Sequence, residues 1–391
     1  MFAAISKTSD HLDGASEGTP TVGQEVEMAG QNKTMTRLSD GANQDDSSTI
    51  LHHPEQVDFD LPGKHHYFLA FHLDSSWGYS LVPLTVINGL RKPAPGVELP
   101  SLAAFGGTHG NEWEGQVVVK RLCRKLDPNE ICGRVILMPQ LSQSACAANQ
   151  RISPLDQVNM NRAFPGNPRG SISLRIANFV KSRVFPKTRI VIDLHAGGRE
   201  GGFALCTSFH PVPNAAQFAE ISHAASLFDT PFMLIYSSQM ASGLLTDEAE
   251  ADGKIAIGGE FGFGEGVSRK GVLHAYEGIR NVMKHYGLLS GEILKIDPAR
   301  QSSPRLVDAR NLEDYVPSPR TGIWEPLVEL GDDVKEGQLL GRLHDFSDHG
   351  AEPLALHAHR SGVLIMMCGM ATSQQGTTLY VIAQDATSAA S

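Results

Sequence analysis

The sequence lacks an excess of positive charge and long hydrophobic runs. Its 391 residues include 33 Lys and Arg against 43 Asp and Glu, a formal net charge of −10 with His neutral. Phosphate backbones attract basic surfaces, so we expect no nucleic-acid partner. No stretch reaches about 18 consecutive apolar residues, and the first residues hold no apolar core of the kind that a secretory signal needs. The sequence therefore predicts no membrane association and a cytoplasmic location.

Cysteine is scarce as well, and several catalytic motifs are missing. The five Cys are an odd number, and no two of them have CxxC spacing. This argues against a disulfide framework and a thiolate zinc site, and it favours a reducing compartment. The sequence also has neither a GxGxxG phosphate loop nor a serine nucleophile elbow. Their absence argues against nucleotide binding and serine hydrolase chemistry.

Three segments differ in composition. Residues 1–55 are rich in Ser, Thr, Gly, Asp, Asn and Gln, and we predict a disordered tail because such a segment cannot bury enough apolar surface to offset its chain entropy. Residues 56–302 alternate between strand and helix patterns, which predicts an α/β domain on a mostly parallel sheet. In residues 303–391 Pro and Gly recur and helical periodicity vanishes, which predicts a small all-β domain.

The α/β pattern is specific enough to place individual elements. Residues 139–170 have no clear period, and a loop of that length in a compact domain is usually functional or disordered. The expected strands cover residues 66–73, 80–87, 102–106, 134–138, 189–194, 231–235 and 254–260, and the expected helices cover residues 111–126, 171–184, 215–227, 243–251 and 272–286.

Polar side chains follow three of the expected strands directly. His109 and Glu112 come after the strand at 102–106, Asp193 and His195 end the strand at 189–194, and Glu260 ends the strand at 254–260. In open α/β sheets, ligands bind beyond the carboxyl ends of the strands. We therefore expect these imidazoles and carboxylates to meet at one rim of the sheet.

This set of side chains suits zinc. Catalytic zinc takes three protein ligands from His and Glu and leaves a position for water. His109 and Glu112 are three residues apart, so one turn presents both to the same ion, and His195 completes the triad. Glu260 remains outside it as a base, which a metal-activated water of pKa about 7 requires nearby. Asp193 either hydrogen-bonds a ligand imidazole or belongs to the structural hydrogen bonds of the strand.

Two arginines lie in the long segment between these strands. Arg151 and Arg162 each present a planar fork that can hold a carboxylate. Beside a zinc site, they suggest one group that polarises the scissile carbonyl and one that clamps an anion. The alternative is that both are ordinary loop cations.

Four motifs carry a family resemblance. The segments FGGTHGNEWEG, NMNRAFPG, DLHAGG and Glu260-Phe-Gly resemble the succinylglutamate desuccinylase/aspartoacylase family of zinc-carboxypeptidase-like hydrolases. NMNRAFPG and DLHAGG most resemble its N-acetyl-diaminobutyrate deacetylase branch, from ectoine degradation. The resemblance covers about residues 64–295, and the C-terminal part resembles the appended β-domain of the family. The resemblance implies a zinc-carboxypeptidase-like mixed sheet flanked by helices, followed by a smaller C-terminal all-β domain.

The resemblance also implies a role for each matching residue. One zinc ion per subunit is expected on His109, Glu112 and His195. Glu260 matches the glutamate that activates water and then protonates the leaving amine. Asn161 and Arg162 match the pair that binds the substrate α-carboxylate, and Arg151 occupies roughly the place of the arginine that stabilises the oxyanion.

The expected activity is zinc-dependent hydrolysis of an N-acyl amino acid, for example N-acetyl-diaminobutyrate. Two alternatives stay open: a zinc carboxypeptidase or amidase on peptide-like substrates, and a non-catalytic binding module on the same fold. The segment FGFGEGVSRKG after Glu260 departs from the family pattern and leaves the acyl group open. The loop at 197–202 is either a lid or a connector. Assembly into a homo-oligomer also stays open.

Overall fold

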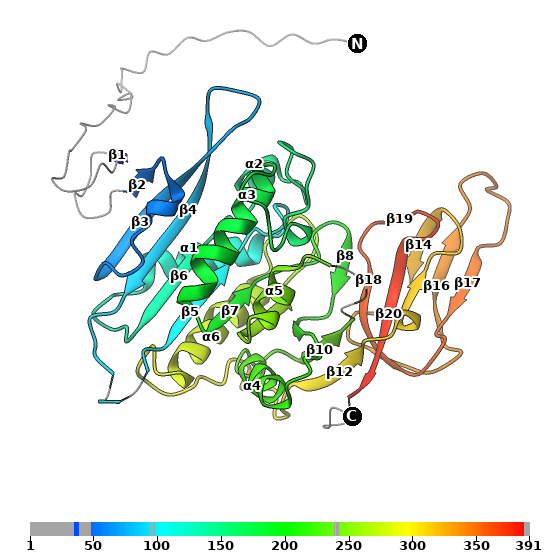
Figure 1. The fold of residues 1–391 in the computed structure, drawn as a ribbon. Helices are drawn as coiled ribbons and strands as arrows, with labels where there is room; N and C mark the ends of the chain where they lie inside the picture. Colours follow the sequence, from blue (N-terminus) through cyan, green and yellow to red (C-terminus); the bar gives the residue numbers. More distant parts are fainter. Residues whose placement is uncertain are drawn as a thin grey trace, which may run out of the picture.

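One long mixed sheet organises the protein (Figure 1). The computed structural model describes residues 35–38, 48–93, 95–96, 98–237, 239 and 242–386. In order across the sheet, the strands are β1 (Met35–Leu38), β2 (Ser48–Leu51), β3 (Gly63–His72), β4 (Tyr79–Asn88), β6 (Arg134–Met138), β5 (Ser101–Phe105), β7 (Ile190–Asp193), β11 (Ile255–Glu260), β9 (Cys206–Phe209), β10 (Phe232–Tyr236), β12 (Arg305–Ala309), β20 (Thr378–Asp385), β18 (Gly362–Cys368) and β15 (Asp333–Val334). Off this path, β13 (Tyr315–Pro317) pairs with β20 and β8 (Gly201–Phe203) pairs with β18.

The centre of the sheet is parallel and buried on both faces. β6, β5, β7 and β11 run parallel to one another, whereas β4 and β9 join this group in antiparallel pairs. Along β7, Ile190 and Ile192 belong to one core and Val191 to the other, because successive side chains alternate between the faces. Burial on both faces explains why these strands appear in the sequence as continuous apolar runs.

Helices cover both faces and confirm the expected mixed sheet with flanking helices. α1, α4 and α6 share the core of Ile190, while α3 and α5 share the core of Val191. No helix in the described part of the chain is long and apolar enough to cross a bilayer. The bounds are α1 (Trp113–Lys125), α2 (Gln143–Ala148), α3 (Ile172–Phe179), α4 (Ala215–Ser226), α5 (Leu245–Ala251) and α6 (Arg269–His285).

The C-terminal region is built from strands, as expected, and includes a second sheet. Its order is β17 (Leu354–His357), β16 (Leu339–His344), β14 (Gly322–Pro326) and β19 (Thr372–Ser373). Trp324 and Leu343 from this sheet pack with Leu364 and Leu379 of β18 and β20 in a small core. These strands lie at one end of the molecule, beyond β10 and β12 (Figure 1).

The main sheet continues from the α/β part into the C-terminal strands. β12 pairs in parallel with β10 and antiparallel with β20, so the sheet crosses the expected boundary at residue 303 without a break. A buried cluster joins the two sides, with members Cys206, Leu234, Val307, Ile365 and Val381. The sequence did not reveal β8 or β9, and β8 pairs with β18 of the C-terminal region.

Part of the segment expected to be disordered is strand instead. β2 pairs in parallel with β3, and β1 pairs with β2. The reason is local, because Ser48–Leu51 contains Thr, Ile and Leu, and Leu51 is only 2% exposed within the core of β3 and β4. The rest of that prediction, for residues 1–34 and 39–47, lies outside the described residues.

Candidate active site

Three neighbouring strands bring the predicted site residues to one edge of the sheet. β5, β7 and β11 lie side by side and run parallel. Phe105 of β5 pairs with Asp193 of β7, and the backbone of His195 bridges to that of Glu260. Because parallel strands end at the same edge, the segments that follow them meet there.

The turn after β5, which carries His109 and Glu112, depends on glycine. Gly107 has φ +65°, and a Cβ there would lie 2.6 Å from the Sγ atom of Cys146. Glycine alone combines a positive φ with so close an approach at no steric cost. The turn ends at Glu112, the N-cap residue of α1, since the helix begins at Trp113, two residues after its predicted start at residue 111. Glu112 therefore leaves the turn with extended backbone and its side chain directed to His109.

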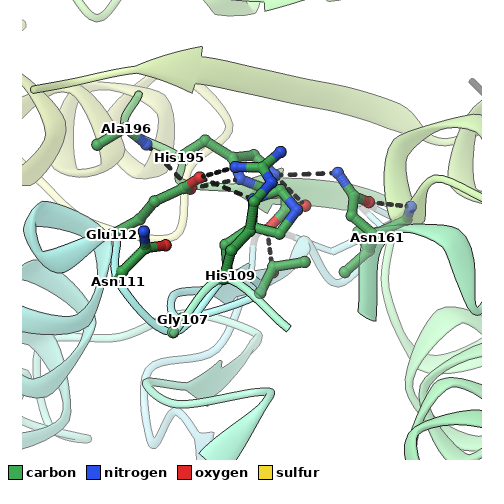
Figure 2. Close-up of polar contacts among 12 residues, drawn as sticks. Gly107, His109, Asn111, Glu112, Asn161, His195 and Ala196 are labelled. Atoms are coloured by element: carbon green, nitrogen blue, oxygen red, sulfur yellow. Dashed lines mark hydrogen bonds and ion pairs between the residues drawn. The ribbon is translucent and has the colours of Figure 1, made fainter. Parts of the chain in front are cut away.

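The Glu112 carboxylate contacts both imidazoles (Figure 2). Its Oε1 atom is 2.7 Å from Nδ1 of His109, and its Oε2 atom is 2.8 Å from Nδ1 of His195. The backbone N–H of Ala196 also donates to Oε2, at 3.1 Å. His109 and Glu112 are each 3% exposed. The structure thus brings together the three residues that the sequence selects as metal ligands.

Each imidazole faces a second oxygen at its other nitrogen. Nε2 of His195 lies 2.8 Å from Oδ2 of Asp193. Nε2 of His109 lies 3.1 Å from Oδ1 of Asn159, and this atom is an oxygen because it accepts the backbone N–H of Asn161 at 2.9 Å. Both rings are therefore held as Nε2–H donors, with Nδ1 turned to the centre of the site.

This arrangement fits a divalent cation. A neutral imidazole donates from only one nitrogen, so the His109 ring, which has an oxygen at both nitrogens, leaves one contact unsatisfied. A cation held by the two Nδ1 atoms and the Glu112 carboxylate resolves the conflict, because each Nε2–H keeps its acceptor. The candidate ligand atoms of His109, Glu112 and His195 lie within 4.8 Å of one another. Two imidazoles and one carboxylate form a donor set typical of catalytic zinc.

The charges of the three residues follow from their contacts. Burial alone would raise the pKa of Glu112, but His109 and His195 outweigh it and hold that pKa well below its usual range. Burial lowers the pKa of His109. At His195, Asp193 and Glu112 outweigh burial and raise the pKa well above its usual value. Glu112 is therefore a carboxylate and His109 neutral, as metal ligation requires, whereas His195 holds a proton that a metal ion would displace.

Glu260 lies beside this centre as an unpaired carboxyl group. Its Oε2 atom is buried and has no hydrogen-bond partner among the described residues. Burial and the charge of Glu112 raise the pKa of Glu260 to about 8. A carboxyl group with a raised pKa is a stronger base, and its unsatisfied oxygen remains available to a proton donor in the cavity.

The two arginines occupy different positions. Arg151 donates from Nη1 to Oε1 of Glu112, at 2.9 Å, so its guanidinium lies next to the candidate metal ligands. Arg162 forms no ion pair within 4.0 Å in the described part of the chain, and its Nη1 donates only to the backbone oxygen of Asn161, at 2.6 Å. Burial and the charge of Arg151 lower the pKa of Arg162. Among the described residues, Arg162 is thus an exposed cation on the cavity wall without a paired counter-charge.

Asn161 is oriented by the start of α5. Its Oδ1 atom accepts the backbone N–H of Leu245 at 2.9 Å, so its amide nitrogen is the free end of the side chain. That nitrogen lies 3.4 Å from Nε2 of His195 (Figure 2). Asn161 and Arg162 together offer a side-chain amide and a guanidinium as donors to an anion near the candidate metal ligands.

A cavity of about 430 Å³ is lined by all seven site residues selected from the sequence. These are His109, Glu112, Arg151, Asn161, Arg162, His195 and Glu260. Pockets of about 300–1,000 Å³ suit small-molecule ligands. The wall also includes residues that sequence reasoning missed, because strand pairing and not sequence proximity brings them there. These are Glu200 from the loop before β8, Tyr236 from β10, and a group from the C-terminal region consisting of Tyr315, Ile365, Met366, Thr377, Thr378 and Val381.

Asn159 is a further residue that the sequence did not single out. It lies within the NMNRAFPG motif, and its side chain holds His109 by Nε2 and caps the turn that carries Asn161. The available signal was a polar residue two positions before the predicted substrate-binding pair, within the same motif.

Comparisons with known proteins agree with this geometry. Residues 98–286 match the model of the succinylglutamate desuccinylase/aspartoacylase catalytic domain. The chain is 33% identical over 332 residues to an N-alpha-acetyl-L-2,4-diaminobutyric acid deacetylase of Halomonas elongata, covering 84% of this chain and 94% of that protein. The chain therefore belongs to the succinylglutamate desuccinylase/aspartoacylase family, whose names describe the removal of acyl groups from amino acids. The expected branch, that of the diaminobutyrate deacetylases, is confirmed as well.

Solved structures show the same fold. A succinylglutamate desuccinylase/aspartoacylase from Rhodobacter sphaeroides superposes with a TM-score of 0.78 at 31% identity, over 85% of this chain and 98% of the other. The product-bound ectoine utilization protein EutE (DoeB) from Ruegeria pomeroyi superposes with a TM-score of 0.77 at 28% identity, over 84% and 98% of the two chains.

Proposed function

We propose that this protein is a zinc-dependent deacylase, which hydrolyses the amide bond of an N-acyl amino acid to a carboxylate and a free amine. N-α-acetyl-2,4-diaminobutyrate is the leading substrate, supported by the 33% identity to a deacetylase of that compound. The observation that carries the proposal is a cluster in which the Nδ1 atoms of His109 and His195 face the Glu112 carboxylate. The Glu260 carboxyl group lies beside this cluster with an oxygen that has no hydrogen-bond partner among the described residues.

In this proposal one zinc ion is held by His109, Glu112 and His195. When bound, zinc polarises the acyl carbonyl and lowers the pKa of water toward about 7. Asp193 and Asn159 hold the outer nitrogens of the two imidazoles and so fix the ring orientations.

Glu260 acts as general base and then as general acid. Its free Oε2 takes the proton of the attacking water, and the same oxygen returns that proton to the departing amine nitrogen. The raised pKa of Glu260, about 8 in the absence of metal, suits a group that accepts and releases a proton in one cycle.

Arg151 stabilises the developing charge on the acyl oxygen. Its guanidinium already contacts Oε1 of Glu112, so it lies close to where the carbonyl is attacked. A preorganised cation at that place stabilises the tetrahedral oxyanion more than the neutral amide and therefore accelerates the reaction.

Asn161 and Arg162 hold the α-carboxylate of the substrate. The unpaired guanidinium of Arg162 supplies the charge and the oriented amide nitrogen of Asn161 supplies a second donor. Binding the carboxylate there fixes the position of the amide carbon relative to Glu260, which lowers the entropic part of the barrier.

An amine-release assay tests the proposal. The panel contains N-α-acetyl-2,4-diaminobutyrate, N-acetylaspartate, N-succinylglutamate and short peptides, each with and without a chelator. Chelator-sensitive release from at least one N-acyl amino acid is the expected result. Release from peptides alone would assign the site to a carboxypeptidase or amidase, and no release with metal bound would assign it to a binding module.

A further inference from the structure

Glu200 is a carboxylate in the cavity wall that the proposed chemistry does not use. Three carboxylates line the cavity, and two of them, Glu112 and Glu260, already have roles. Glu200 lies in the turn that connects β7 to β8 and is half-buried. Carboxylates are rarely removed from water without a cationic partner. The question is therefore which cation pairs with the Glu200 carboxylate.

The position of Glu200 is fixed by both parts of the fold. Its side-chain Oε2 accepts the Nδ2–H of Asn111 at 3.0 Å, and Asn111 directly precedes Glu112 in the chain. Its backbone oxygen accepts the N–H of Gly369 at 3.1 Å, in the turn after β18. The turn itself needs Gly198, because φ is +58° and a Cβ there would lie 3.0 Å from the Glu200 carboxylate. Glu200 is therefore preorganised, and the loop at 197–202 is held at its second half by the pairing of β8 with β18.

No cation in the part of the chain that the structure describes pairs with Glu200. Its neighbour Arg199 pairs with Glu265 instead, at 3.0 Å. Among the described residues, no Lys, Arg or His lies within 4.0 Å of the Glu200 carboxylate as an ion pair. Within the described ranges, its side chain has one hydrogen bond, to the neutral amide of Asn111. The carboxylate thus enters the cavity wall with one oxygen oriented and its charge uncompensated.

We propose that Glu200 binds the side-chain ammonium of the substrate and selects N-acylated diamino acids. This inference rests on the proposed function and deepens it. The α-carboxylate pairs with Arg162, and the side-chain ammonium pairs with Glu200. The cavity therefore matches an amino-acid product that carries a negative α-carboxylate and a positive side chain. A side-chain carboxylate, as in N-acetylaspartate or N-succinylglutamate, would instead meet a fixed negative charge.

A second acidic group near the cavity is the rival for this role. Asp247 and Glu250 of α5 lie close to Nδ1 of His210, at 3.2 and 2.9 Å. These two carboxylates already share an imidazole, and neither lines the cavity. Of these three carboxylates, Glu200 is the one that lines the cavity and can touch a bound cation directly, which is why the assignment goes to it.

Product binding to the zinc-loaded protein tests the inference by calorimetry. The ligands are L-2,4-diaminobutyrate and L-2-aminobutyrate, which differ by the side-chain amine. A charged hydrogen bond contributes roughly 10- to 100-fold in affinity, so we expect the wild type to prefer diaminobutyrate by about that factor. Glu200→Gln should reduce the preference to about 2-fold, and Glu200→Asp should retain part of it. Asp247→Asn is the matched control and should retain all of it.

The outcomes separate this inference from the proposed function. Equal binding of the two ligands by the wild type, a preference that survives Glu200→Gln, or a preference lost in Asp247→Asn would each overturn the role of Glu200. Amine release from N-α-acetyl-2-aminobutyrate measures the deacylase activity independently of the side-chain amine. Suppose that neither N-α-acetyl-2-aminobutyrate nor N-α-acetyl-2,4-diaminobutyrate releases an amine, while the preference for binding diaminobutyrate still depends on Glu200. This result would overturn the deacylase proposal and would retain the ammonium site.

Discussion

The Asp193 carboxylate holds the outer nitrogen of the His195 imidazole, with Oδ2 at 2.8 Å from Nε2. Its other oxygen accepts the hydroxyl of Thr108 at 2.6 Å, and Asp193 is fully buried. The carboxylate is thus fixed on both sides and aligns the ring whose Nδ1 faces Glu112.

Replacing Asp193 should therefore weaken metal binding. We expect Asp193→Asn to lower zinc affinity by about 10- to 100-fold, because the ring loses the charged acceptor that orients it and strengthens its Nδ1 as a ligand. Competition with a chromophoric chelator measures the change. The matched control is Asp252→Asn, which removes a half-exposed partner of Lys181 and should leave zinc affinity unchanged. Equal affinity in wild type and Asp193→Asn would show that the contact only stabilises the fold.

Replacing Glu260 should separate metal binding from turnover. Glu260→Gln keeps the shape of the side chain but removes the proton-accepting oxygen that is unpaired in the cavity. We expect kcat to fall by about 10²- to 10⁴-fold, with zinc content near that of the wild type. Glu277→Gln, on α6 and paired with Arg280, makes the same chemical change away from the cavity and should keep full activity. An unchanged kcat in Glu260→Gln would refute the role of this residue as base.

Replacing Arg162 should affect only substrates with an α-carboxylate. Its guanidinium has no counter-charge in the described structure, so we expect Arg162→Ala to raise KM for N-α-acetyl-diaminobutyrate by about 10- to 100-fold. The α-carboxamide of the same substrate cannot form the ion pair, and it should lose little. Steady-state kinetics on both compounds provides the comparison. An equal loss for the carboxamide would show that Arg162 supports the cavity without binding the carboxylate.

The stability of the protein should depend on pH through Asp229. Burial alone would raise the pKa of Asp229, but the backbone N–H of Asp297 together with Lys295 and Arg300 outweighs it and lowers that pKa. A lowered pKa in the folded state means that this carboxylate contributes stability above its unfolded pKa of 3.8, and the contribution is lost as the pH falls through the lowered value. Asp229→Asn should therefore destabilise the protein by about 2–3 kcal/mol at neutral pH.

Urea unfolding of the wild type and Asp229→Asn at pH 7 and near pH 2 measures this dependence. The difference in unfolding free energy should shrink toward the acidic end, because the contribution of the charged carboxylate is lost as the pH falls from 3.8 toward the lowered pKa of the folded state. Asp348→Asn, in an exposed turn, serves as the control and should show no such trend. A difference that stays constant over the range would show that the charge of Asp229 contributes nothing.

Sequence reasoning found the metal candidates because strand ends are a local signal. His109, His195 and Glu260 each follow an apolar run directly, and the parallel order of those runs brings their ends together. Imidazole and carboxylate side chains that meet in this way are the ligands of a divalent cation, so the residue types predicted the kind of site. The expected helices were found for the same reason, since an amphipathic period is visible within a single segment.

Contacts between distant segments were not visible in this way. β9 contains Thr207 and Ser208, which are buried by pairing with β11 and β10 and do not resemble an apolar strand. β8 is a Gly-Gly-Phe segment whose strand character comes from β18 about 165 residues later. Glu200 was missed for this reason, because the pairing that turns its loop into a cavity wall depends on register and not on composition.

The cluster around Cys206 and Ile365 has a practical consequence for dissecting the chain. A fragment that stops before Arg305 would leave the backbone edge of β10 unpaired and its apolar partners in contact with water. Such an edge is a template for self-association, so truncation would give aggregation in place of a smaller enzyme. The strands from β12 onward therefore belong to the same folding unit as the α/β part, and proteolysis between the two would not leave a stable enzyme.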